Sequence, residues 1–173
     1  MKNNNIFYFL YKFSISILSF VFLFFILNFQ SSLSFFSIFE ISTPSLISIG
    51  IYLCVVRFNI NPSNTILFLT GFLHDIMNGN NIGTTSIFLL LFKYFINSII
   101  LEKISKKDQE EWIYFTIIFI LSFCFVILFN LIINFSIPEF SPIFFHIGIT
   151  LIIFPIINIS IDFFSFVSRL IKN

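Results

Sequence analysis

Six apolar segments, separated by short polar connections, take up almost the whole of the 173-residue chain. Hydrophobic residues make up 58% of it and charged residues only 10%, well below the roughly 25% of soluble domains. The sequence therefore predicts an all-α integral membrane protein that forms a single polytopic domain over residues 1–173. The expected helices cover about residues 13–29, 44–58, 63–78, 85–101, 112–134 and 143–167.

Basic side chains are confined to alternate connections, and this sets the expected orientation of the helices. If the N-terminus lies in the cytoplasm, the outer connections carry no lysine or arginine, and Lys93 falls inside a helix. The other eight of the nine basic residues lie on the inner side: Lys2, Lys12, Arg57, Lys103, Lys106, Lys107, Arg169 and Lys172. The positive-inside rule therefore predicts six transmembrane helices with the N- and C-termini cytoplasmic.

Several function classes are disfavoured by the composition and by the spacing of reactive residues. The net charge of +1 argues against nucleic acid as a partner, because binding it needs a basic stripe. Cys54 and Cys124 lack the flanks of zinc or redox motifs, and neither His74 nor His146 has a second ligand at metal spacing. No nucleophile paired with a base, phosphate loop or pair of catalytic carboxylates occurs in the sequence. We therefore expect neither an enzyme nor a cofactor or metal site.

Asp75 is the costliest residue to place in a membrane. It follows Gly71 by one helical turn, near the expected outer end of the third helix, where the helix dipole disfavours an anion. Two sources of compensation are open: the free amides of the fourth helix around residues 84–86, and the ammonium group of Lys93 if its stem snorkels outward. Asp75 either ties this helical hairpin together or takes part in binding.

Two pairs of polar residues lie four positions apart on expected helices. Lys93 and Asn97 form one pair, and Asn158 and Asp162 form the other. Such stripes either line a path for a solute or make hydrogen bonds between helices. Pro155 lies near the middle of the expected sixth helix and should kink it.

The connection before the second helix is expected to lie along the outer membrane interface. It runs over residues 30–43 and includes Glu40, which belongs in the head-group region. Pro44 then fits the first turn of the second helix, with Ser42 or Thr43 as its cap. On the opposite side, Trp112 marks the interface at which the fifth helix begins.

The central hairpin resembles that of MreD, a family of small bacterial rod-shape-determining membrane proteins. The resemblance rests on an ordered set of residues: Pro44, Tyr52, Gly71-x-x-x-Asp75, Gly79 and Gly83. It implies a non-enzymatic component of the bacterial inner membrane that is needed for cell shape and organises lateral peptidoglycan synthesis. Such a protein would bind MreC, a single-span periplasmic protein, and through it MreB and the peptidoglycan glycosyltransferase and transpeptidase.

The resemblance also implies roles for the hairpin residues. The three glycines would let a partner helix approach closely in the lipid bilayer, and Asp75 would fix the hairpin or accept a hydrogen bond from the partner. Lys93 is added to these hairpin residues because the expected topology, and not the resemblance, makes it a candidate ion-pair partner of Asp75.

An alternative resemblance is to the six-helix substrate-binding membrane subunits of energy-coupling-factor vitamin transporters. It implies a polar cavity that opens outward beneath the connection over residues 30–43, and a cytoplasmic surface of small residues for a transport motor. The absence of alanine counts against such a surface. A third interpretation is a membrane scaffold without an MreC-like partner.

Overall fold

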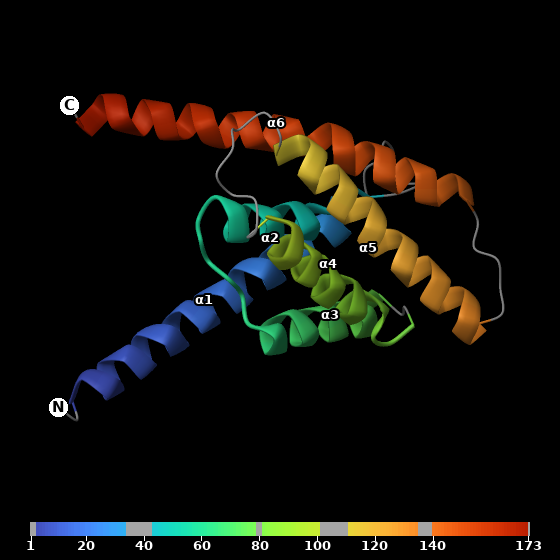
Figure 1. Cartoon of the computed structure of the whole chain (residues 1–173), viewed down its shortest axis with the longest axis horizontal. Coiled ribbons are helices and arrows are strands. Elements are labelled where there is room, and N and C mark those ends of the chain that lie inside the picture. The colour runs from blue at the N-terminus through green and yellow to red at the C-terminus, as the bar shows by residue number, and fades with distance from the viewer. Residues whose placement is uncertain (1–2, 34–42, 79–80, 101–110, 135–139, 173) are drawn as a thin grey trace.

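Six α-helices and no strand make up the residues described by the structure, a computed structural model (Figure 1). These residues are 3–33, 43–78, 81–100, 111–134 and 140–172. The predicted all-α class and the order of six helices are confirmed for this part of the chain. The helices are α1 (Asn3–Leu33), α2 (Leu46–Val56), α3 (Asn64–Asn78), α4 (Thr84–Ile100), α5 (Glu111–Asn134) and α6 (Phe140–Lys172).

Two of these helices contain segments long and apolar enough to cross a membrane, at Glu111–Phe129 in α5 and Ser141–Phe163 in α6. Three shorter apolar segments lie at Ile17–Leu33, Leu46–Val56 and Thr84–Ile99. The 11 residues of α2 extend only about 16 Å, roughly half of a hydrocarbon core of about 30 Å. The described helices thus fit a membrane protein, and the six-span topology stays a prediction.

α1 extends beyond the apolar run that predicted it. Polar side chains at its end bond to carbonyl oxygens one turn earlier: Asn28 Nδ2 donates to Phe24 O at 2.8 Å and Ser31 Oγ to Leu27 O at 3.1 Å. Because these polar groups are satisfied within the helix, it continues to Leu33, into the segment expected to be a connection. The rest of that connection, with Glu40, lies outside the described residues.

α2 is the most enclosed helix and is shorter than predicted. Seven of its residues are buried, and it packs against α1 and α4 (Figure 1). Its first turn begins at Leu46, so Pro44 precedes the helix, and the predicted cap at Ser42 or Thr43 is wrong because Ser45 occupies the N-cap position. The free amides are satisfied by other helices. Ser45 N donates to Thr150 Oγ1 at 2.9 Å and Ile47 N donates to Gln30 Oε1 at 3.2 Å.

Aromatic side chains fill the core between α2, α4, α5 and α6. Phe115 of α5 stacks on Phe154 of α6, with ring centroids 4.1 Å apart. The Tyr52 ring meets both edge-on, at 5.3 and 5.4 Å. Such pairs stabilise beyond the area they bury, so this cluster joins the two long helices to the buried α2.

α6 continues without interruption through Pro155 as a single helix (Figure 1). A proline has no N–H, so the carbonyl oxygen of Leu151, one turn earlier, loses its usual donor. The indole Nε1 of Trp112 donates to this oxygen at 3.3 Å. α5 begins at Glu111, so Trp112 lies at its start as predicted.

Candidate functional site

The carboxylate of Asp75 bridges α3 to the beginning of α4. Its Oδ2 accepts hydrogen bonds from Gly83 N at 2.8 Å and Thr85 N at 3.2 Å, and the residue is fully buried. Amides at the first turn of a helix have no partner within it, so the carboxylate caps α4 and meets the positive end of its dipole. The amides are therefore the compensating group, the first of the two alternatives left open by the sequence.

Lys93 does not pair with Asp75. Its Nζ donates to Pro62 O at 2.6 Å and to Asn64 Oδ1 at 2.7 Å, at the opposite end of α3. Asp75 lies 11 residues beyond Asn64, about 16 Å along the helix. The pairing considered from sequence is wrong because the antiparallel register of the hairpin, with Gly71 against Ser86, places Lys93 beside the start of α3.

Gly71 and Gly83 have structural roles within the hairpin. A Cβ built on Gly71 would lie 2.5 Å from Ser86 N, so the close approach at this glycine is between α3 and α4. Gly83 has a φ of +95° and nothing within 4 Å of a built Cβ, so it supplies a turn conformation. Gly79 lies outside the described residues. Gly71 is thus occupied by α4 and is not free for a partner helix.

Tyr52, within α2, and Pro44, two residues before it, are both buried. Tyr52 is fully buried, and its hydroxyl donates to Glu111 O at 3.0 Å, which connects α2 to the first residue of α5. Pro44 is buried, and its carbonyl oxygen accepts from Leu46 N at 2.9 Å. Both residues therefore stabilise the buried helix.

A polar cluster joins α2, α5 and α6 near Val56, the last residue of α2. We call Arg57, Glu111, Asn158 and Asp162 the Arg57 cluster. Arg57 Nη2 lies 2.9 Å from Glu111 Oε2, Arg57 Nη1 pairs with Asp162, and Asn158 Nδ2 donates to Glu111 Oε2 at 3.3 Å. The Asn158 and Asp162 stripe therefore makes contacts between helices, one of the two interpretations that the sequence allowed.

The Arg57 cluster combines one guanidinium group with two carboxylate groups. Burial lowers the pKa of the Arg57 guanidinium, but hydrogen bonds and attraction from Asp162 and Glu111 outweigh it, so its pKa lies above the usual value. Sequence reasoning placed Arg57 in a turn and did not single out Glu111. Glu111 and Asp162 lie 54 and 105 positions after Arg57, so the local sequence gives no sign that they pair with it.

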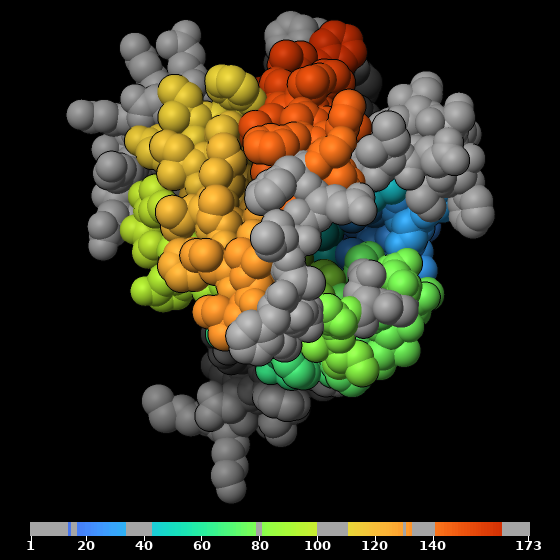
Figure 2. Space-filling view, turned by 90° about the vertical axis from the view of Figure 1, so that its right-hand side faces the viewer, coloured from blue at the N-terminus to red at the C-terminus, as the bar shows by residue number. Residues whose placement is uncertain are grey.

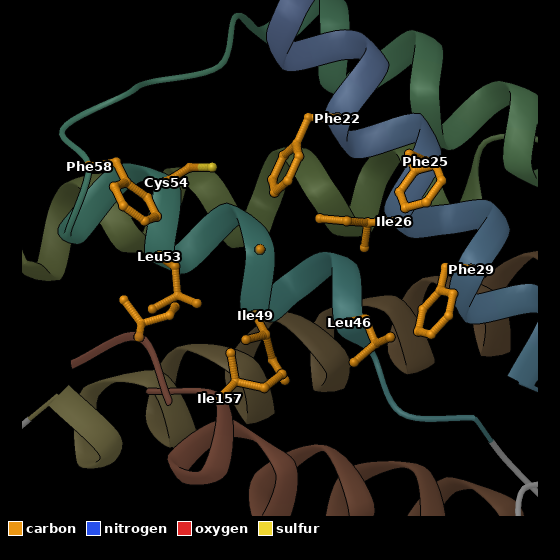
Figure 3. Close-up of a pocket in the computed structure, with 12 residues that line it drawn as sticks. Phe22, Phe25, Ile26, Phe29, Leu46, Ile49, Leu53, Cys54, Phe58 and Ile157 are labelled. Atoms are coloured by element: carbon orange, nitrogen blue, oxygen red, sulfur yellow. The ribbon is translucent and has the colours of Figure 1, made fainter. Parts of the chain in front are cut away.

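An apolar groove runs between α1, α2 and α6. One cavity of about 350 Å³ holds Gly50 at its α2 wall, and Figure 3 shows phenylalanines of α1 turned toward α2 across it. A second cavity of about 410 Å³ continues from it and shares Phe22, Cys54 and Phe58. We call the two cavities the apolar groove. Its other lining residues are Leu18, Ser19, Leu23, Phe25, Ile26, Phe29, Leu46, Ile49, Leu53, Ile60, Pro62, Ile157 and Ile161.

A cavity of about 340 Å³ with both apolar and polar walls lies at the end of the bundle where α2 and α4 begin. Figure 2 looks at this end, where α1, the α3 and α4 hairpin, α5 and α6 surround a recess. We call this cavity the outer pocket, after the expected orientation. It is lined by Leu27, Gln30, Ser45, Ile47, His74, Thr84, Thr85, Phe88, Phe123, Val126 and His146.

His74 and His146, neither of which has a second ligand at metal spacing in the sequence, share the outer pocket. His146 Nδ1 lies 2.6 Å from Thr43 O, and His74 Nδ1 lies 3.4 Å from Thr85 Oγ1. Both are half-buried. Across the described part of the chain, no three residues of the types His, Cys, Asp and Glu lie close enough to hold a metal ion.

Comparison with known proteins finds no match: no family model, no curated protein and no solved structure matches this chain.

Proposed function

We propose that the chain is a non-enzymatic scaffold of the bacterial inner membrane, in which an MreC-like single-span protein binds and the cell-elongation machinery is organised. In this proposal all six helices lie in the membrane and both termini are cytoplasmic. The order of Pro44, Tyr52, Gly71, Asp75 and Gly83, which resembles the MreD hairpin, supports the family. Asp75 and Gly71 act by holding the hairpin together, because both are buried within it.

The apolar groove is the observation on which the proposal rests. From Phe29 back to Leu18 its α1 wall extends about 16 Å, the length of three turns of a partner helix. Helices associate in lipid through close packing at small residues rather than through hydrophobic burial. Ser19 and Cys54 supply small side chains along the groove, and Gly50 leaves room there that the flexible end of Ile26 borders. We infer that side chains from one face of a single transmembrane helix pack into this groove.

The test is purification of the tagged full-length protein from its own cells in mild detergent, followed by mass spectrometry. The proposal expects recovery of an MreC-like single-span coiled-coil protein together with peptidoglycan synthases. Recovery of transport ATPases, with no such coiled-coil protein, would overturn it.

A second candidate function is that of a substrate-binding subunit of an energy-coupling-factor transporter. The outer pocket favours it, because that class implies a polar cavity beneath the connection over residues 30–43, and Gln30 lines the pocket. The same purification separates the two candidates, since a transporter subunit would bring down the ATPases of a transport motor.

A further inference from the structure

The outer pocket has the size and lining of a small-molecule site. Its volume of about 340 Å³ lies within the range of roughly 300–1,000 Å³ that is typical of ligand pockets. Such pockets combine apolar and aromatic walls with a few fixed polar groups. Here Phe88 and Phe123 supply the aromatic wall, and Gln30 and His146 supply the polar groups.

Gln30 presents a hydrogen-bond donor held in one orientation. Its Oε1 accepts from Ile47 N at 3.2 Å, at the start of α2, and the residue is only 9% exposed. That bond fixes the orientation of the side-chain amide, so its nitrogen, Nε2, is directed away from Ile47 N. The Nε2 of Gln30 donates to no residue that the structure describes.

His146 presents a hydrogen-bond acceptor, whereas Gln30 presents a donor. Because Thr43 O can only accept, the Nδ1 that lies 2.6 Å from it carries the proton. In a neutral imidazole the remaining nitrogen, Nε2, is then an acceptor. The ring is also held by Phe123, at a centroid distance of 5.5 Å and an interplanar angle of 29°.

The lining of the outer pocket also disfavours a charged ligand. With histidine neutral, none of the described residues that line the outer pocket carries a formal charge. Asp75 lies behind Thr84 and Thr85, and its oxygens are bonded to the start of α4. A charged ligand in this pocket would lose its hydration without gaining a counter-charge.

We propose that the outer pocket binds a small, uncharged molecule with a planar ring, which accepts a hydrogen bond from Gln30 and donates one to His146. The ring lies against Phe88 and Phe123, whose faces suit stacked or edge-on aromatic partners. This inference rests on the pocket's own lining and holds whether the chain is a scaffold or a transporter subunit.

The test uses three probes of nearly equal size: 2-naphthamide, which is uncharged and hydrogen-bonding, 2-naphthoate, which is an anion, and naphthalene, which has no polar group. Binding is measured by equilibrium dialysis against the full-length protein in detergent, with empty micelles subtracted. We expect saturable binding of 2-naphthamide, and at least tenfold weaker binding of 2-naphthoate and naphthalene. Equal or tighter binding of 2-naphthoate, or no saturable binding of 2-naphthamide at millimolar concentration, would overturn the inference.

Two variants place the binding in the outer pocket. Val126→Trp fills it, whereas Val21→Trp makes the same change on a half-exposed position of α1 outside it. We expect Val126→Trp to weaken the binding of 2-naphthamide at least tenfold and Val21→Trp to leave it unchanged. Gln30→Glu keeps the oxygen that accepts from Ile47 N but removes the Nε2 donor, so its affinity for 2-naphthamide should also fall at least tenfold. This variant keeps the test decisive even if Val126→Trp fails to fold. Unchanged binding in Gln30→Glu would contradict the proposed contact.

Discussion

The indole nitrogen of Trp112 on α5 donates a hydrogen bond to the carbonyl oxygen of Leu151 on α6, at 3.3 Å. That oxygen has no donor within its own helix because the residue one turn later is Pro155. In lipid, a carbonyl group freed by proline needs a partner from another helix, since no water is available. The bond therefore joins the two longest apolar segments among the described residues, at the point where Pro155 removes one backbone hydrogen bond from α6.

Replacing Trp112 by Phe should destabilise the fold by about 1 kcal/mol, the usual net value of one hydrogen bond. In a Pro155→Ala background the same substitution should cost clearly less, because the alanine restores an N–H donor to the carbonyl oxygen of Leu151. The measurement is a double-mutant cycle on the free energy of unfolding in detergent. Equal costs in the two backgrounds would show that the indole does not replace the missing amide.

Gly71→Ala should destabilise the protein by about 1–3 kcal/mol through overpacking. The new methyl group would lie 2.5 Å from Ser86 N and 2.6 Å from Ser86 Cα, and backbone atoms cannot move aside as a flexible side chain can. Gly148→Ala is the matched control on α6, where nothing lies within 4 Å. It should stabilise by up to about 1 kcal/mol from helix propensity. Thermal unfolding in detergent compares the two, and similar melting temperatures would contradict the packing of α3 on α4.

Asp75→Ala should cost about 2 kcal/mol, because it leaves the amides of Gly83 and Thr85 without an acceptor. Lys93→Met should also destabilise, by removing the bonds to Pro62 and Asn64. The two effects should add to within about 0.5 kcal/mol in the double variant, since the sites are far apart. A coupling larger than about 1 kcal/mol would instead indicate an ion pair between them.

Contacts that lie close in sequence could be predicted, and those between distant segments could not. The amides that satisfy Asp75 lie within ten residues of it, across one short turn, so the hairpin pattern included Thr85 N among two open alternatives, although Gly83 N lies just outside the range expected. The partners of Arg57 lie 54 and 105 residues away, and nothing in the apolar pattern indicates which helices meet there.

The boundaries of α2 illustrate the same limit. Its apolar run predicts a helix over 44–58, but the start is set by Gln30 and Thr150, which belong to α1 and α6. The position of Lys93 likewise depends on the register of two helices, which Gly71 and Ser86 fix by contact. His74 and His146 share a pocket only because α3 ends and α6 begins beside the same recess, so their association carries no signal in the sequence.

The scaffold proposal is tested most directly by filling the apolar groove. Gly50→Leu places a side chain in it, and the 2.9 Å contact with Ile26 Cδ1 can be relieved by movement of that flexible end. Gly148→Leu adds the same side chain to α6 where nothing lies within 4 Å. Each tagged variant is purified at equal expression, and the co-purified MreC-like protein is quantified by mass spectrometry. We expect at least a tenfold loss with Gly50→Leu and none with Gly148→Leu, whereas equal recovery in both would contradict the groove as the partner's binding site.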